Sequence, residues 1–159
     1  MRGRFGVGSR SYRLDGGLAG LDYTQGILGR RTCWRWAHAL GHLADGRSVG
    51  INLVAGFNDD NEDTNENALW IGDQLIPLGR AEFDYNSEDP SQMWTITTDC
   101  GTVHLHFDAY FVFREERHWK VIDSSFVQPA GRFEGILKVD GQRHDVTLFG
   151  VTEDQDVYW

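Results

Sequence analysis

The sequence has little of what marks disulfide scaffolds, thiolate metal sites and membrane spans. Its two cysteines, Cys33 and Cys100, are too few and too far apart for a disulfide framework or a zinc site made of thiolates, so we expect buried free thiols. The chain has no run of about 18 apolar residues and no apolar segment behind the N-terminal MRGRFG. The sequence therefore predicts neither a membrane span nor a signal peptide, and hence a cytoplasmic location.

Basic residues are also scarce, because 15 Lys and Arg stand against 24 Asp and Glu, which gives a net charge of −9. Phosphate binding depends on clustered Lys and Arg, so this balance argues against a nucleic-acid partner. Residues 1–48 nevertheless hold eight Arg and three Asp, whereas the rest of the chain holds seven basic and 21 acidic residues. An anionic partner for the basic N-terminal part is the less favoured alternative.

Prolines number only three, and turn signals recur as Asx-Gly pairs between runs with β character. The turn signals are Asp15-Gly16-Gly17, Asp45-Gly46, Gly72-Asp73, Asp99-Cys100-Gly101 and Asp140-Gly141. The runs are SVGINLVAGF, ALWIG, QLIPLG, AEFDY, MWTITT, TVHLHFDAYFVF, FEGILKV and HDVTLFGV. These candidate strands, without strand-helix alternation, indicate an all-β antiparallel sandwich or barrel, and a barrel of this size can enclose a small ligand.

The segment from Arg31 to Leu43, RTCWRWAHALGHL, fits two structures. It contains good helix formers and would place Trp34, His38 and His42 on one helical face, yet large residues also alternate along it with the period of a strand. Because the segment runs through Ala44-Asp45-Gly46-Arg47 into a clear strand, we prefer the first arm of a hairpin.

An acidic loop, FNDDNEDTNENALW at residues 57–70, is the most conspicuous polar stretch. It fails as an EF-hand, because Thr64 stands where the turn needs Gly and Trp70 where a bidentate Glu is needed. Weak calcium binding by Asp59, Asn61, Asp63 and Asn65 is the alternative to a solvated turn, which we prefer. At the end of the loop, Asn65, Glu66 and Asn67 precede an apolar strand, where polar groups must be hydrogen-bonded or functional. The simpler interpretation is that both Asn side chains cap loop backbone.

His104 and His106 lie on one face of a predicted strand, a spacing that metal sites use. The stretch GTVHLH is similar to the cupin signature, but Ala109 and Tyr110 stand where a cupin has its Glu. We therefore prefer an outward polar face and expect no metal site. The chain also has no Gly-x-Ser-x-Gly elbow, Gly-rich phosphate loop or dinucleotide fingerprint, so we expect no cofactor.

Aromatic and acidic residues supply the remaining candidates. The aromatic residues on predicted strands fit a core or an apolar pocket, and the core interpretation is preferred for any single one. They are Trp34, Trp36, Trp70, Phe83, Tyr85, Trp94, Phe107, Phe126 and Phe133. The carboxylates that could act as general acids are Asp22, Glu66, Asp84, Glu134, Glu153 and Asp154.

A series of motifs runs in order along residues 14–159: LDYTQG, RRTCWRWA, ADGRSVGINLVAGFND, ENALW, FDY, FVQPAGRFEG and GVTEDQDVYW. This series resembles the carboxyl-terminal half of the uncharacterised domain-of-unknown-function family 2804, a match that includes Asn58 and residues 65–67. The family is distantly similar to lipocalin-like two-barrel proteins, including carotenoid hydratases and pericyclic cyclases that shelter apolar substrates. Where the family's closing motif tends to read Glu-Asp-His, this chain has Gln155, which excludes a His-based proton transfer there.

The resemblance implies an antiparallel lipocalin-like (calycin-type) β-barrel of about eight or more strands joined by hairpins. Residues 1–13 would form an N-terminal arm that can be flexible, and residues 14–159 a single barrel domain. Full-length relatives run about twice this length, which leaves open pairing with a second barrel or a homo-oligomer. Such pairing through exposed aromatic surface is one function that we consider, as a structural β-domain.

The function that we prefer from the sequence is binding of a small, largely apolar molecule inside the barrel. The ligand-binding candidates are Trp34, Trp36, Asn52, Asn65, Asn67, Trp70, Tyr85, Trp94, Gln128 and Phe133. The alternative is a hydratase, isomerase or cyclase, in which a buried carboxylic acid protonates an alkene or polarises a carbonyl. Its catalytic candidates are Glu66 and Glu153.

Overall fold

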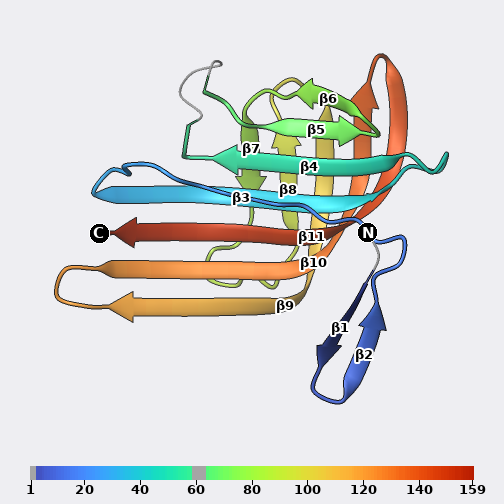
Figure 1. The fold of residues 1–159 in the computed structure, drawn as a ribbon. Helices are drawn as coiled ribbons and strands as arrows, with labels where there is room; N and C mark the ends of the chain where they lie inside the picture. The colour runs from blue at the N-terminus through green and yellow to red at the C-terminus, as the bar shows by residue number, and fades with distance from the viewer. Residues whose placement is uncertain (1–2, 59–63) are drawn as a thin grey trace.

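The computed structural model describes residues 3–58 and 64–159, which form eleven strands and no helix. The middle of the acidic loop, with Asp59, Asn61 and Asp63, lies outside the described residues. Two strands, β1 (Arg4–Val7) and β2 (Arg10–Arg13), form a separate hairpin within the expected N-terminal arm. All its residues are exposed, and the hairpin projects away from the rest of the chain (Figure 1). The described part contains no helix that could span a membrane.

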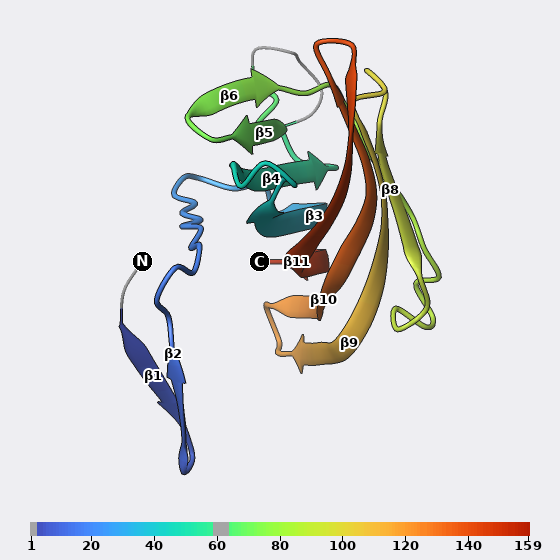
Figure 2. The same ribbon diagram turned by 90° about the vertical axis from the view of Figure 1, so that its right-hand side faces the viewer.

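The other nine strands form one antiparallel sheet that curls strongly into a half-barrel (Figure 2). They are β3 (Arg31–His42), β4 (Ser48–Ala55), β5 (Ala68–Ile71), β6 (Gln74–Pro77), β7 (Ala81–Asp84), β8 (Trp94–Thr98), β9 (Val103–His118), β10 (Asp123–Val139) and β11 (Gln142–Tyr158). The predicted all-β antiparallel fold is confirmed, as is the strand at residues 31–42.

The sheet is open, unlike the expected closed barrel, because its order in the described residues is β6-β5-β4-β3-β11-β10-β9-β8-β7. Its edge strands, β6 and β7, have four residues each and follow one another in the chain. Closing a barrel requires a continuous hydrogen-bonded ladder around the axis. Residues 78–80 connect β6 directly to β7, so a chain connection spans the seam between the two edges.

Glycines on β10 and β11 permit the strong curl. Gly131 lies directly opposite Gly150, beside a register shift between Ala130 and Gly131. A Cβ atom on Gly150 would lie 1.9 Å from the backbone oxygen of His38, and one on Gly131 would lie 2.0 Å from that of Asp108. A bulge with glycine lets a strand bend sharply and lets neighbouring backbones approach closely.

The concave face of the sheet is filled by a packed aromatic cluster. Trp94, Phe107 and Phe133 have no exposed surface, and the Phe107 ring lies 4.6 Å from that of Phe133 and 6.3 Å from that of Trp94. Tyr85 stacks on Trp94 with a centroid distance of 3.7 Å. Facing this cluster, β3 contributes small side chains, including the fully buried Ala37. A curled β-sheet with a buried aromatic cluster is compatible with ligand binding.

Asn67 holds the connection across the seam. Its side chain is only 2% exposed, its Oδ1 accepts a hydrogen bond from the Val54 N–H at 2.5 Å, and its Nδ2 donates to the Gly79 carbonyl at 3.1 Å. Asn65 adds a bond from its Nδ2 to the Leu78 carbonyl at 2.9 Å. Both side chains therefore satisfy backbone groups that a loop at a sheet edge would otherwise leave unpaired.

Both cysteines are free, but neither is buried as expected. Cys33 is half-buried beside Asp156, and Cys100 is exposed because it lies in the turn between β8 and β9. Hydrogen bonds hold the Cys100 sulfur in place: the Gly79 N–H lies 3.4 Å from Sγ, and the hydroxyl oxygens of Thr98 and Thr102 lie at the same distance.

Candidate ligand-binding site

Strand alternation gives β3 and β11 two chemically different faces. Residues with even numbers on β3, including Trp34 and Trp36, lie on the outer face of the sheet, and those with odd numbers lie on the core face. On β11 the numbering is reversed, because Glu153 pairs with Trp36 in the register while Asp154 pairs with Arg35. The outer face thus receives indoles and Glu153, whereas the core face receives the arginines of β3.

A cleft of about 280 Å³, open to solvent, lies on this outer face. Its lining consists of Asp22, Thr24, Leu28, Trp34, Trp36, Val54, Phe57, Glu66, Glu153 and Trp159. The segment between β2 and β3, which runs across the front of β3 in Figure 1, forms one wall. It packs tightly there, since a Cβ atom on Gly20 would lie 2.1 Å from Nε2 of His38.

Glu153 is a cleft carboxylate that two neighbouring side chains orient. Its Oε2 accepts a hydrogen bond from the indole N–H of Trp34 at 3.2 Å, and its Oε1 accepts one from Nε2 of Gln128 at 2.7 Å. Both donors are neutral, so they orient the carboxylate without neutralising its charge. Glu153 is half-buried, whereas Asp22 and Glu66 are exposed at the rim.

A second set of hydrogen bonds positions Trp36 and the rim. The indole N–H of Trp36 donates to Oδ1 of Asn52 at 2.8 Å, and Nδ2 of Asn52 donates to the Glu66 carbonyl at 3.0 Å. Trp36 also stacks on His38, with ring centroids 5.7 Å apart and an interplanar angle of 10°. Burial lowers the pKa of His38, so this imidazole is neutral at neutral pH.

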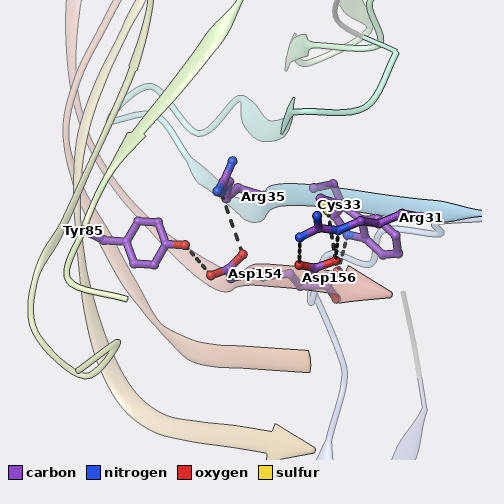
Figure 3. Close-up of polar contacts among 8 residues, drawn as sticks. Arg31, Cys33, Arg35, Tyr85, Asp154 and Asp156 are labelled. Carbon is purple, nitrogen blue, oxygen red and sulfur yellow. Dashed lines mark hydrogen bonds and ion pairs between the residues drawn. The ribbon is translucent and has the colours of Figure 1, made fainter. Parts of the chain in front are cut away.

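The core face of the same strands carries two ion-paired groups at the end of the half-barrel (Figure 3). In the first, the Tyr85 hydroxyl donates to Asp154, whose Oδ1 lies 3.8 Å from Nε of Arg35. Burial, together with this hydrogen bond, raises the pKa of Tyr85 to about 12. The group closes the polar end of the aromatic core.

In the second group, Arg31 donates twice to Asp156, with distances of 3.1 and 2.6 Å. The hydrogen bonds from Arg31, followed by the contact with Cys33, lower the pKa of Asp156 to about 2. The two arginines of β3 are therefore paired on the core face, away from the cleft that the outer face presents.

The structure brings together four of the residues predicted from the sequence, because Trp34, Trp36, Glu66 and Glu153 all line the cleft. Two more, Asn52 and Gln128, orient them through hydrogen bonds. The other six predicted residues lie elsewhere. Trp94 and Phe133 belong to the core, Tyr85 to the core-face ion pairs, Asn65 and Asn67 to the seam, and Trp70 to an exposed position on β5.

Several lining residues were missed as ligand-binding candidates. Asp22 carried a signal only as one of the six carboxylates considered, and Val54 and Phe57 only as members of a predicted strand. Thr24 and Leu28 follow no periodic pattern, because the segment that carries them is irregular. Only the folded arrangement shows that this segment covers the sheet.

The histidine pair lies outside the cleft. His104 and His106 point outward from β9 with ring centroids 5.3 Å apart, and Nδ1 of His106 lies 3.3 Å from the Thr95 hydroxyl. Within residues 3–58 and 64–159, no three or more His, Cys, Asp or Glu side chains gather in a way that could hold a metal ion.

The strand order and the outer-face cleft define an all-β half-barrel domain. The chain belongs to the family described as domain of unknown function DUF2804, whose model matches residues 1–159. The resemblance drawn from the motifs is thus confirmed, and the matched region includes the N-terminal arm. No curated protein and no solved structure matches the chain significantly.

Proposed function

We propose that this domain binds a small, largely apolar molecule in the outer-face cleft, between the indoles of Trp34 and Trp36 and the carboxylate of Glu153. The observation that carries the proposal is the hydrogen bond between Trp34 and Glu153 within a hollow lined by further aromatic rings. Binding sites characteristically combine apolar walls with a few fixed polar groups that orient the ligand. The lipocalin-like character proposed from the resemblance then concerns the sheet, with the ligand outside its packed interior.

Catalysis through a carboxylic acid is less well supported by the geometry than binding. A carboxyl group must be withdrawn from water to remain protonated near neutral pH, and Glu66 is exposed. Glu153 is better shielded, but both its oxygens are acceptors in hydrogen bonds from neutral side chains, which fixes it as an acceptor group in the cleft. Glu153 therefore suits the recognition of a hydrogen-bond donor on the ligand.

Native mass spectrometry of freshly purified protein tests the proposal. We expect an excess mass from a retained small molecule, and we expect Trp34→Ala to lose it. Trp70→Ala is the matched control, because Trp70 is an exposed indole on β5 outside the cleft. Thermal unfolding of each variant verifies that it folds. Wild-type protein at its bare mass, with no small molecule from a library perturbing the indole NMR signals of Trp34 and Trp36, would overturn the proposal.

A further inference from the structure

The cleft combines two features that together select the charge of a ligand. Four aromatic side chains, those of Trp34, Trp36, Phe57 and Trp159, share the lining with three carboxylates. The rings of Trp34 and Phe57 stand at an angle of 58° with centroids 6.3 Å apart, as two adjoining walls would. Among the described lining residues there is no Arg, Lys or His.

The three carboxylates keep their charge uncompensated. In the part of the chain that the structure describes, the ion pairs do not include Asp22, Glu66 or Glu153. Strand alternation explains this, since Arg31 and Arg35 pair with acids on the core face. The donors that reach Glu153 are an indole and an amide, neither of which carries charge.

We propose that the ligand of this cleft is a small organic cation, an alkylammonium or quaternary ammonium compound, held against the indoles and beside Glu153. A cation gains from the negative face of an aromatic ring, most strongly from Trp, and gains again from a partly shielded carboxylate. An anion would meet three negative charges, and a neutral molecule could use the walls and hydrogen bonds but would gain nothing from the charges. This inference rests on the proposed function, whose cleft it uses.

Choline and its neutral isostere, 3,3-dimethylbutan-1-ol, test the charge directly, because they differ in having nitrogen or carbon at the same position. Titrations followed by the indole NMR signals of Trp34 and Trp36 give both affinities. We expect choline to bind about tenfold more tightly than the alcohol, because a cation–π contact in a partly shielded cleft adds to the attraction of the carboxylate. Added salt should weaken the binding of choline and leave that of the alcohol nearly unchanged.

Glu153→Gln keeps the shape of the side chain and removes its charge. It should weaken choline binding several-fold while leaving the alcohol unaffected, and Asp73→Asn in the β5–β6 turn should change neither affinity, although it removes the same charge. Equal affinities for choline and the alcohol, or an equal loss of both in Glu153→Gln, would overturn the proposal of a cationic ligand. Either result would leave the proposal that the cleft binds a small molecule intact. If neither compound bound, the cation would also be wrong, and native mass spectrometry alone would decide whether the cleft binds neutral molecules.

Discussion

The indole N–H of Trp34 on β3 donates a hydrogen bond to the carboxylate of Glu153 on β11. A double-mutant cycle with Trp34→Phe and Glu153→Leu measures this bond. We expect a coupling free energy of about 1 kcal/mol, because hydrogen bonds in partly buried positions contribute on that scale. The control cycle combines Trp70→Phe with Glu153→Leu. Trp70 lies on β5, three strands away from β11 in the sheet order, so this cycle should give a coupling near zero. Urea unfolding supplies the four stabilities, and a Trp34 coupling as small as the control would contradict the bond.

Asn67→Ala should destabilise the protein by roughly 2–3 kcal/mol, because it leaves the buried Val54 N–H and the Gly79 carbonyl without their partners. Asn65→Ala should cost less, about 1 kcal/mol, since Asn65 is only partly buried and water can replace its bonds to the Leu78 carbonyl and the Asn67 N–H. Chemical denaturation measures both. If the two variants had equal stability, Asn67 would not be the principal contact across the seam.

Tyr85 should make stability depend on alkaline pH. Its folded-state pKa of about 12 lies above the ordinary value of 10, so its contribution is complete below pH 10 and is lost as pH rises toward 12. Tyr85→Phe should remove that loss and lower stability at pH 7 by roughly 1.5 kcal/mol, through the missing hydrogen bond to Asp154. A difference titration of wild type against Tyr85→Phe, followed by phenolate absorbance, should show the Tyr85 transition near pH 12. A transition at pH 10 would refute this environment.

Cys100 should react with iodoacetamide at physiological pH, with a half-maximal rate near pH 7. Burial opposes ionisation of this thiol, but hydrogen bonds from Thr102, Thr98 and the Gly79 N–H outweigh it and lower its pKa to about 7. Cys33 should react more slowly, because its hydrogen bond to Asp156 raises the pKa of its thiol. Mass spectrometry after short labelling should find one modification, absent in Cys100→Ser. Preferential labelling of Cys33 would contradict this order.

Much of the fold follows from local patterns, because each predicted turn between Asp45 and Gly141 joins strands that the structure contains. The lengths of β9, β10 and β11 did not follow. The outer part of β9, residues 114–118, is charged on both faces, and the outer parts of β10 and β11 mix polar with apolar residues, so no regular apolar alternation marks these segments. The strands of the N-terminal hairpin were not predicted either, because all its residues are exposed and no apolar pattern marks them.

The faces of β3 show why the site was only partly predictable. Size favours Trp34 and Trp36 as core residues, yet the core face of this strand carries Ala37 and Ala39, which are fully buried. Where β3 packs on the aromatic core, its core face carries these two alanines, and the indoles face outward. A sequence shows which residues alternate, but the face that becomes the interior depends on how distant strands pack.

The pairing of β3 with β11 also sets the order in which the fold can assemble. These strands meet in the middle of the sheet, although Arg31 and its partner Asp156 are separated by 125 positions in the chain. Every strand from β4 to β10 pairs with a strand that is adjacent to it in the chain. On its other side, β3 has no partner until β11, the last strand of the sheet, has been made. Long-range pairing of this kind slows folding, because a large loop must close before the contact stabilises it. During synthesis the outer parts of the sheet can therefore pair early, and the central pairing of β3 with β11 forms last.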